Sequence, residues 1–207
     1  TIVLGVNENS FDARKELVVS NASCTTNCLA PLAQCLDEEF GLERGLMVTV
    51  HSYTNDQNLH DAPHGDDWRR ARAAALSMVP TSTGAAKAVG DVLPHLKGRL
   101  SGYAVRVPTP DVSLTDLTCQ LRSAVSVEQI NAAARKWAEG RLKGILRYTD
   151  EPLVSMDFRG DPHSCIFDAR CTLVADGHMA KVVAWYDNEV GYSYRLIELA
   201  GYIGRHV

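Results

Sequence analysis

The sequence has no run of about 18 consecutive apolar residues, so we expect no membrane-spanning helix. It has no CxxC pair and no cysteine and histidine cluster with zinc-finger spacing, which argues against a structural zinc site. No GxGxxG motif follows a predicted strand and no Walker A motif occurs, so no nucleotide-binding unit is recognisable. A formal net charge of −4 gives no reason to expect nucleic acid or an acidic membrane as the main partner.

The composition is that of an ordinary folded chain. With 207 residues, 45% of them hydrophobic, the chain is long enough to bury a core without a disulfide scaffold. Residues 1–7 lack the basic segment of a signal peptide, so we expect a cytoplasmic protein whose cysteines are free thiols. The six cysteines are Cys24, Cys28, Cys35, Cys119, Cys165 and Cys171.

Apolar periodicity predicts an α+β domain. Helices are expected over residues 25–40, 81–93, 126–140 and 189–205, the third of them opening with Ser126 and Gln129 at capping-box spacing. Strands are expected over residues 1–7, 15–21, 46–54, 101–110, 112–122, 144–150 and 153–158, with a hairpin over 171–187 that turns at Asp176-Gly177. Because strands and helices do not alternate regularly, the sheet is expected to be mostly antiparallel.

The stretch "SNASCTTNC", residues 20–28, could hold a metal, half of a disulfide, a redox pair, or one reactive thiol beside a structural cysteine. Cys24 lies at the predicted start of the first helix, where the helix dipole and unpaired N–H groups favour a thiolate. Cys28 and Cys35 fall in the apolar stripe of that helix and are expected in the core. Metal and disulfide roles are disfavoured, and spacing alone leaves open whether Cys24 is reactive or structural.

His51 ends a predicted apolar strand, a position from which side chains often line a cleft. If it meets Cys24, it is the natural candidate to hold the thiolate and to move protons. Most histidines are structural or merely exposed, and the sequence does not show that these two side chains meet. The exposed alternative is favoured for the other histidines, which are His60, His64, His95, His163, His178 and His206.

Two further features could bind anions. Thr83 and Gly84, in "PTSTG", lie at the start of a predicted helix, where hydroxyls and free N–H groups could cradle a phosphate or simply cap the helix. Arg106 lies in an otherwise apolar strand, so its charge must point to solvent or meet an anion. Together with a thiol and a histidine, two anion sites favour acyl transfer on a phosphorylated substrate.

A long polar stretch, residues 55–72, shows no clear periodicity and ends in a basic cluster of Arg69, Arg70 and Arg72. A loop of this length inside a compact domain is usually functional. The simpler interpretation of its arginines is a solvated face or a contact with another subunit.

Six stretches carry a resemblance to a known family. They are "SNASCTTNCLAPLA", "HSYTNDQ", "RRARAAA", "PTSTGAAKAV", "AVRVPTPDVSLTDL" and "AWYDNEVGYSYR". Together they closely resemble the phosphorylating glyceraldehyde-3-phosphate dehydrogenases, through essentially the whole chain. The first half of that family, a Rossmann domain, has no counterpart here.

The resemblance implies a division of the chain and a fold. Residues 1–23 would be the end of the nucleotide-binding domain, residues 24–187 the catalytic domain, and residues 188–207 a helix that packs on the nucleotide-binding domain. The catalytic domain would be a mostly antiparallel mixed sheet with long helices on one face and no complete Rossmann domain. The loop over residues 53–76 would line the cofactor cleft of a neighbouring subunit, which implies a homotetramer in the full-length protein.

The resemblance also implies a reaction, the NAD-dependent oxidative phosphorylation of glyceraldehyde 3-phosphate to 1,3-bisphosphoglycerate in glycolysis. Cys24 would be the nucleophile, passing through a thiohemiacetal and a thioester, and His51 would activate it and stabilise the oxyanion. Thr54 and Arg106 would bind the phosphate of the substrate, and Arg70 would lie near the phosphate sites. The attacking inorganic phosphate would be bound by Ser23, Thr25, Thr83 and Gly84.

Asn188 would hydrogen-bond the nicotinamide amide, and Tyr192 would pack beside the ring. NAD-specific members usually have Leu-Pro where this chain has Ala62-Pro63, so we hypothesise some tolerance of NADP, with NAD as the main cofactor. We expect neither cofactor to bind tightly to this chain alone. Two alternatives are the related erythrose-4-phosphate dehydrogenase, and an isolated domain that keeps a reactive thiol without dehydrogenase activity.

Overall fold

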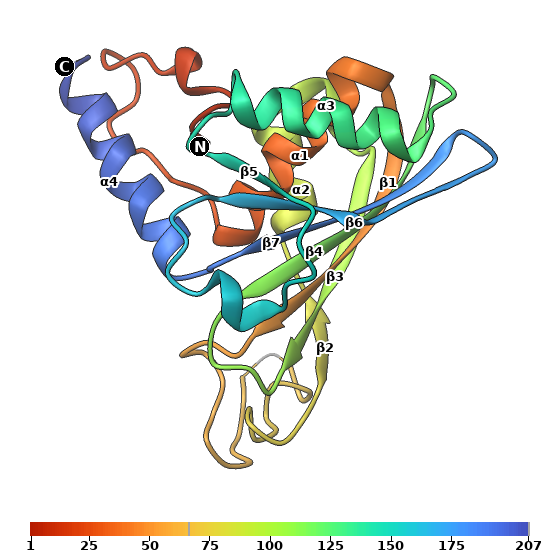
Figure 1. The fold of residues 1–207 in the computed structure, drawn as a ribbon. Coiled ribbons are helices and arrows are strands. Elements are labelled where there is room, and N and C mark those ends of the chain that lie inside the picture. Colours follow the sequence, from red (N-terminus) through yellow and green to blue (C-terminus); the bar gives the residue numbers. More distant parts are fainter. Residues whose placement is uncertain (66, 207) are drawn as a thin grey trace.

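The computed structural model describes residues 1–65 and 67–206; Asp66 in the predicted loop and Val207 in the predicted terminal segment lie outside them. Within the described residues the chain forms one seven-stranded sheet in the order β2-β3-β1-β4-β7-β6-β5 (Figure 1). The strands are β1 (Leu42–Ser52), β2 (Val79–Ser82), β3 (Leu100–Val107), β4 (Ser113–Leu121), β5 (Leu146–Thr149), β6 (Cys165–Ala175) and β7 (Met179–Tyr186). The pairs β1–β3 and β5–β6 are parallel and the other four are antiparallel, so the predicted mostly antiparallel mixed sheet is confirmed.

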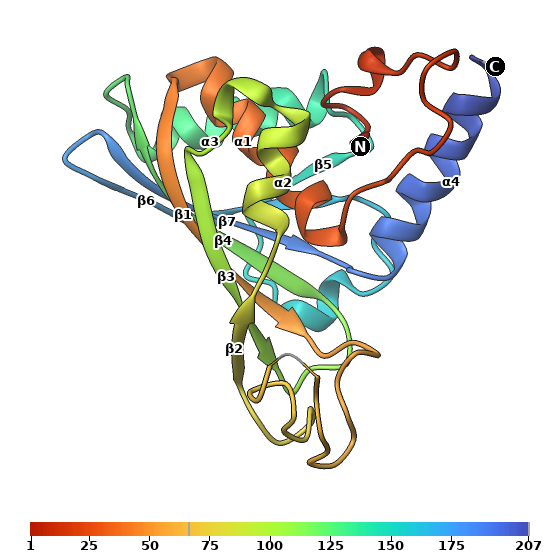
Figure 2. The ribbon, with the colours of Figure 1, turned by 180° about the vertical axis from the view of Figure 1, so that it is seen from behind.

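Helices cover one face of this sheet. The α-helices are α1 (Cys24–Phe40), α2 (Ala85–Val92), α3 (Val127–Glu139) and α4 (Val190–Gly204), and the 3-10 helices are η1 (Glu8–Ser10), η2 (Pro94–Leu96) and η3 (Ser155–Phe158). Helices α1, α2 and α3 lie on the same side of the sheet, while α4 stands beside the N-terminal segment (Figures 1 and 2). None of the described helices combines the length and the hydropathy that a membrane span requires.

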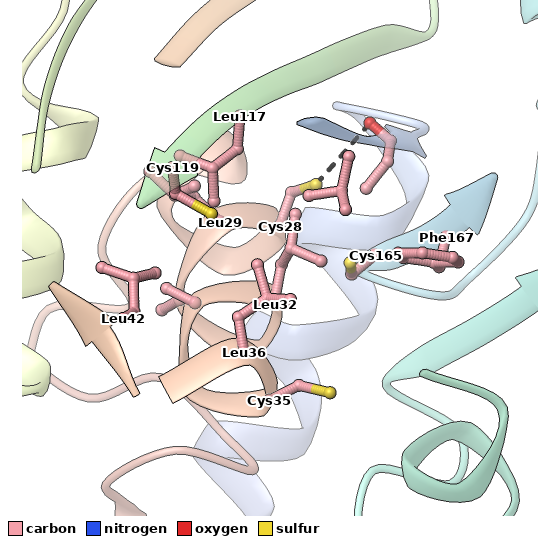
Figure 3. Close-up of a cluster of buried hydrophobic side chains, with 14 of the residues drawn as sticks. Cys28, Leu29, Leu32, Cys35, Leu36, Leu42, Leu117, Cys119, Cys165 and Phe167 are labelled. Atoms are coloured by element: carbon pink, nitrogen blue, oxygen red, sulfur yellow. Dashed lines mark hydrogen bonds between the residues drawn. The ribbon is translucent and has the colours of Figure 1, made fainter. Parts of the chain in front are cut away.

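Helix α1 forms the centre of the core. It begins at Cys24 because Ser23 caps it, its Oγ accepting a hydrogen bond of 3.0 Å from the Thr26 N–H. It ends at Gly41, which takes the left-handed conformation with a φ of 75°. Cys28 and Cys35 are 0% and 2% exposed in the core that α1 forms with the sheet (Figure 3), so the prediction that both are core residues is confirmed.

The side chains of β1 alternate between the two faces of the sheet. Met47, Thr49 and His51 alternate with outward residues and are all buried on the face that the helices cover. The parallel pairing with β3 sets His51 opposite Arg106. A histidine and an arginine more than fifty positions apart in the sequence are therefore neighbours at the same end of the sheet.

Two local sequence signals are confirmed. Ser126 and Gln129 form a reciprocal capping box at the start of α3, with hydrogen bonds of 2.8 and 3.3 Å. The β6–β7 hairpin turns at Asp176 and Gly177, whose φ angles of 52° and 70° are those of the tight hairpin turns that favour Asp-Gly.

The strands predicted over residues 1–7 and 15–21 are wrong. Both segments are turns and irregular chain, joined by a hydrogen bond of 2.8 Å from Ile2 N to Ser20 O. Ile2 and Leu4 are buried, but against Leu199 of α4 rather than in the sheet. The apolar residues of these segments correctly indicated burial. A strand also needs a neighbouring strand whose backbone N–H and C=O groups are free to pair with it.

Two other segments also differ from their predictions. The strand expected over residues 153–158 is instead the 3-10 helix η3, in which Phe158 is buried. The helix expected over 81–93 begins only at Ala85, because Val79–Ser82 pairs with the edge of β3 as strand β2. Hydroxyl-rich residues suit a helix start and an edge strand equally well, and only the neighbouring strand decides between them.

We predict that Leu32→Ala, in the buried face of α1, lowers the free energy of unfolding by about 2–5 kcal/mol because it leaves a cavity. The matched control is Leu17→Ala, since Leu17 is 93% exposed, and it should change stability by less than about 0.5 kcal/mol. Urea unfolding followed by tryptophan fluorescence measures both variants. Equal losses in the two would contradict the central place of α1 in the core.

Candidate active site

Cys24 and His51 meet at one end of the sheet. The Sγ atom of Cys24, the first residue of α1, lies 3.5 Å from Nε2 of His51 near the end of β1. His51 is only 4% exposed, while Cys24 is partly exposed. The cap at Ser23 holds the thiol and the sheet holds the ring, so the pair is fixed by two regular elements.

The other nitrogen of His51, Nδ1, has two partners, and its protonation selects between them. It lies 2.8 Å from the Ser52 carbonyl oxygen and 2.7 Å from Nη1 of Arg106. When Nδ1 carries a proton it donates to Ser52 O, and Nε2 is free to accept a proton from Cys24. When Nδ1 is bare it accepts from Arg106, and Nε2–H faces the sulfur. The ring can therefore serve as a base or as a donor toward Cys24.

Burial sets the resting charges of this pair. It raises the pKa of the Cys24 thiol, although Thr25 and the Arg106 charge oppose it. Burial and then the Arg106 charge lower the pKa of His51 to about 4. At neutral pH the resting pair is therefore a thiol and a neutral imidazole. Loss of solvation thus opposes the thiolate that the helix position favours, and the charge state of Cys24 stays a prediction.

Arg106 presents a positive charge that no carboxylate in the described residues neutralises by an ion pair. Its Nη1 also donates to Ser52 O at 3.0 Å, while its buried Nε has no hydrogen-bond partner there. Burial lowers its pKa, although Asp56 opposes this. A half-buried guanidinium whose charge has no carboxylate partner favours the approach of an anion.

Asp56 joins Thr54 to Arg70. The Thr54 hydroxyl donates a short hydrogen bond to Asp56, and Arg70 Nη1 donates to the same carboxylate at 2.7 Å. Arg70 also donates to Thr81 Oγ1 at 2.9 Å and approaches Ser82 O at 3.4 Å. The polar loop therefore folds back, so that one arginine bridges the loop after β1 and strand β2.

The remaining phosphate candidates lie at helix starts. Gly84 is the N-cap residue of α2, and Thr83 Oγ1 accepts a weak hydrogen bond of 3.3 Å from Ala85 N. The Ser23 hydroxyl accepts from Thr26 N and contacts the Thr26 hydroxyl at 2.8 Å. Thr83 and Gly84 directly follow the β2 residues that Arg70 contacts.

Asn188 is held from below by two buried hydroxyls. Ser52 and Ser113 lie 2.9 and 2.8 Å from its Oδ1, which leaves its amide N–H groups with one long contact of 3.3 Å to Glu189. Asn188 is therefore tied to Ser52, the residue that follows His51 in the sequence, and its amide nitrogen keeps donor capacity. Tyr192 lies partly buried in the first turn of α4, four residues further along.

Three residues near the site were not anticipated: Thr49, Asp56 and Tyr186. Tyr186 is 1% exposed, and its ring meets His51 edge to face at 6.0 Å between ring centres. Thr49 shares the alternating face of His51, a signal that strand periodicity contains. No local pattern marks Tyr186, because a tyrosine ending an apolar strand is common in any core.

The two cysteines of "SNASCTTNC" have different environments. Cys28 is fully buried, with its Sγ 3.9 Å from the Ala184 carbonyl oxygen (Figure 3), and all six cysteines are free thiols in this structure. No group of three or more histidine, cysteine or acidic side chains among the described residues could hold a metal ion. The Cys24 thiol therefore contacts His51, whereas Cys28 fills the core.

Comparison with known proteins agrees with this geometry. Residues 23–188 match the family model described as glyceraldehyde 3-phosphate dehydrogenase, C-terminal domain. The chain belongs to the glyceraldehyde-3-phosphate dehydrogenase family. It is 62% identical over 205 residues to the glyceraldehyde-3-phosphate dehydrogenase of Mycobacterium avium and 61% identical over 203 residues to that of Geobacillus stearothermophilus.

The glyceraldehyde-3-phosphate dehydrogenase 1 of Bacillus subtilis is 60% identical over 205 residues. These alignments cover 98–99% of this chain but only 60–61% of the relatives. The chain thus spans about three fifths of the length of these dehydrogenases, and within the described residues it contains the catalytic fold without a Rossmann domain.

We predict that iodoacetamide modifies Cys24 and Cys171 and leaves the four buried cysteines intact in the native chain. Accessibility decides this, since Cys171 is exposed and Cys24 is partly exposed, whereas the other four cysteines are buried. Peptide mass spectrometry after brief labelling measures it, with urea-unfolded protein as the control in which all six react. Faster labelling of Cys28 or Cys165 than of Cys24 would refute the assignment.

We predict that the alkylation rate of Cys24 rises by about tenfold per pH unit across neutral pH, because only the thiolate reacts and its pKa is raised. No inflection is expected near pH 6.5, since His51 has a pKa of about 4. Rates measured in a Cys171→Ser variant isolate Cys24. A plateau of high reactivity between about pH 5 and 8, the signature of a thiolate–imidazolium pair, would contradict the resting state described above.

Proposed function

We propose that this chain is the catalytic part of an NAD-dependent, phosphorylating glyceraldehyde-3-phosphate dehydrogenase of glycolysis. The single observation that carries the proposal is the 3.5 Å contact between Cys24 Sγ and His51 Nε2, next to an arginine with a free donor. A thiol, a proton carrier and an anion site are what acyl transfer from a phosphorylated aldehyde requires.

In the first step the Cys24 sulfur attacks the aldehyde carbon of the substrate. The thiol proton passes to His51 Nε2 and from there to the aldehyde oxygen, which gives a neutral thiohemiacetal. His51 is suited to this when Nδ1–H donates to Ser52 O, because Nε2 is then an acceptor. A substrate phosphate at Arg106 would offset the charge that lowers the pKa of His51, so binding would make the ring more basic.

In the second step the thiohemiacetal carbon loses a hydride and its hydroxyl proton returns to His51 Nε2, leaving a thioester on Cys24. NAD, when bound, supplies the hydride acceptor. Inorganic phosphate then attacks the thioester carbon, the carbon–sulfur bond breaks, and the sulfur takes a proton back from His51. The products are the acyl phosphate and the original thiol.

The two phosphates have separate candidate sites. We assign the substrate phosphate to Arg106 and Thr54, which supply a free guanidinium N–H and a hydroxyl at the same end of the sheet. The attacking phosphate is assigned to the hydroxyls and N–H groups of the two helix starts, with Arg70 between the sites. Those residues are Ser23, Thr25, Thr83 and Gly84.

Asn188 and Tyr192 fit a nicotinamide. The fixed amide of Asn188 keeps N–H donors for the carboxamide oxygen of the ring, and the partly buried Tyr192 offers a flat apolar surface. Ala62, in place of a larger leucine, supports some tolerance of NADP, while Pro63 supports NAD as the main cofactor. We do not expect this chain to bind either tightly without a nucleotide-binding half.

A homotetramer is proposed for the full-length protein. Its support is the sheet face opposite the helices, where Leu46, Tyr103, Leu173 and Met179 are each at least half exposed. The projecting loop after β1 (Figure 1) is also placed to reach beyond its own domain. The cytoplasmic location and the division at residues 23 and 188 stay predictions; the two outer segments pack on each other through Ile2 and Leu199.

We predict that the chain alone forms no NADH from glyceraldehyde 3-phosphate, NAD and phosphate, and that joining it to the nucleotide-binding half of the 61% identical Geobacillus stearothermophilus relative produces activity. Absorbance at the wavelength of NADH measures both, and Cys24→Ser in the joined protein should abolish turnover. NADH formation by the chain alone would contradict the first part, and an inactive but folded and tetrameric fusion would contradict the proposed function.

The same fusion separates the alternatives. Erythrose 4-phosphate as the better substrate by kcat/KM would favour erythrose-4-phosphate dehydrogenase. A negligible kcat/KM with NADP beside NAD would refute the hypothesis that Ala62 permits NADP.

We predict that Arg106→Ala in the fusion raises KM for glyceraldehyde 3-phosphate by about 10–100-fold, because a charge-assisted hydrogen bond is lost. Thr83→Ala should instead raise KM for inorganic phosphate by about 3–10-fold and leave that for the aldehyde unchanged. Steady-state kinetics with each substrate varied in turn tests the assignment. The opposite pattern would exchange the two phosphate sites.

A further inference from the structure

Behind the Cys24–His51 pair runs a chain of three buried hydroxyl groups. Thr49 Oγ1 lies 3.0 Å from the Leu114 carbonyl oxygen and 2.8 Å from the Tyr186 hydroxyl. The Tyr186 hydroxyl lies 2.9 Å from Thr25 Oγ1, beside Cys24. Thr49, Tyr186 and Thr25 are 1%, 1% and 4% exposed, so solvent does not compete for these hydrogen bonds.

The carbonyl at the end of the chain fixes the direction of every hydrogen bond. A carbonyl oxygen only accepts, so the single hydroxyl hydrogen of Thr49 points to Leu114. The hydrogen between Thr49 and Tyr186 must then come from Tyr186, and the hydrogen between Tyr186 and Thr25 must come from Thr25. If every hydrogen bond ran in the opposite direction, lone pairs of Thr49 Oγ1 and the Leu114 carbonyl oxygen would face each other at 3.0 Å.

We propose that Thr49 is a positioning residue which, through Tyr186, turns the Thr25 hydroxyl into a pure hydrogen-bond acceptor on the side of the reacting sulfur. The Thr25 hydroxyl then gives no hydrogen bond to a Cys24 thiolate. Thr25 has two donors near the sulfur, its hydroxyl and its backbone N–H, and a hydrogen bond from either lowers the pKa of Cys24. With the hydroxyl hydrogen given to Tyr186, the backbone N–H is the donor of Thr25 that remains.

One consequence rests on the proposed function. Inorganic phosphate near neutral pH keeps at least one P–OH group, and an acceptor hydroxyl at Thr25 would bind that group. The unprotonated phosphate oxygens, which are the nucleophiles, are then turned toward the thioester on Cys24. The P–OH proton stays on phosphate during the attack, and the bond that breaks is the carbon–sulfur bond.

The test measures the thiol pKa of Cys24 in the 207-residue chain, by alkylation rate against pH in a Cys171→Ser background. Thr49→Val removes the acceptor of Tyr186, whose hydrogen then turns to Thr25 and releases the Thr25 hydrogen to the thiolate. The measured pKa of Cys24 should fall by about one unit, because a hydrogen bond to the charged form favours it. Thr49→Ser keeps the hydroxyl and should behave as the parent.

A double-mutant cycle distinguishes an effect transmitted through the Thr49, Tyr186 and Thr25 hydroxyl groups from a general structural effect of the substitution. In a Thr25→Val background, Thr49→Val should no longer change the pKa of Cys24, because the released hydrogen is absent. An unchanged or raised pKa in Thr49→Val with Thr25 present would overturn the proposal. If Thr49→Val does not fold, Tyr186→Phe releases the same hydrogen and must lower the pKa in its place.

These measurements need no cofactor, so their failure leaves the proposed function standing. Conversely, an inactive fusion would refute the proposed function and leave the direction of the hydroxyl chain intact. In an active fusion, Thr49→Val should raise KM for inorganic phosphate by about 3–10-fold and spare that for glyceraldehyde 3-phosphate. Equal effects on both would show a structural role only.

Discussion

The parallel pairing of β1 with β3 is the constraint on which the site depends. It sets His51 opposite Arg106, and the docking of α1 on the same sheet brings Cys24 within 3.5 Å of the imidazole. A shift of one residue in β1 would turn His51 to the uncovered face, because side chains alternate along a strand. One strand register and one docked helix thus bring Cys24, His51 and Arg106 together.

The same burial that fixes these groups also favours the uncharged forms of Cys24 and His51. The thiol pKa is raised and that of His51 is lowered to about 4, while Arg106 lacks a carboxylate partner among the described residues. An uncompensated arginine is costly in a buried site unless an anion joins it. In the proposed function, charge on the substrate would supply part of the activation, because a phosphate at Arg106 would offset the charge that lowers the pKa of His51. His51 Nδ1 has a hydrogen-bond partner in either tautomer of the ring: it donates to Ser52 O when protonated and accepts from Arg106 when it is not.

Much of the fold was predictable where a local signal was sufficient. Helix α1, the capping box at Ser126 and the Asp176-Gly177 hairpin each follow from a cap, a period or a turn residue that acts within a few positions. The strand predicted for residues 1–7 was wrong because their apolar side chains are buried against α4. Periodicity does not show which element an apolar segment will pack against. Strand β2 was not predicted for the complementary reason: it forms because the edge of β3 offers backbone groups with which Val79–Ser82 can pair.

By itself, the sequence determined that Cys24 lies at the start of a helix and that Cys28 faces its core, and family resemblance supplied the proposed site residues. Helix caps and apolar periodicity depend on residues only a few positions apart, so they can be recognised without knowledge of the tertiary structure. Only the tertiary structure decided which groups meet in the site: that burial raises the thiol pKa of Cys24, that Ser52 O and Arg106 both reach His51 Nδ1, and that Thr49, Tyr186 and Thr25 form one line of hydroxyl groups. Those properties depend on desolvation and on atoms from strands more than a hundred residues apart, which no local pattern encodes.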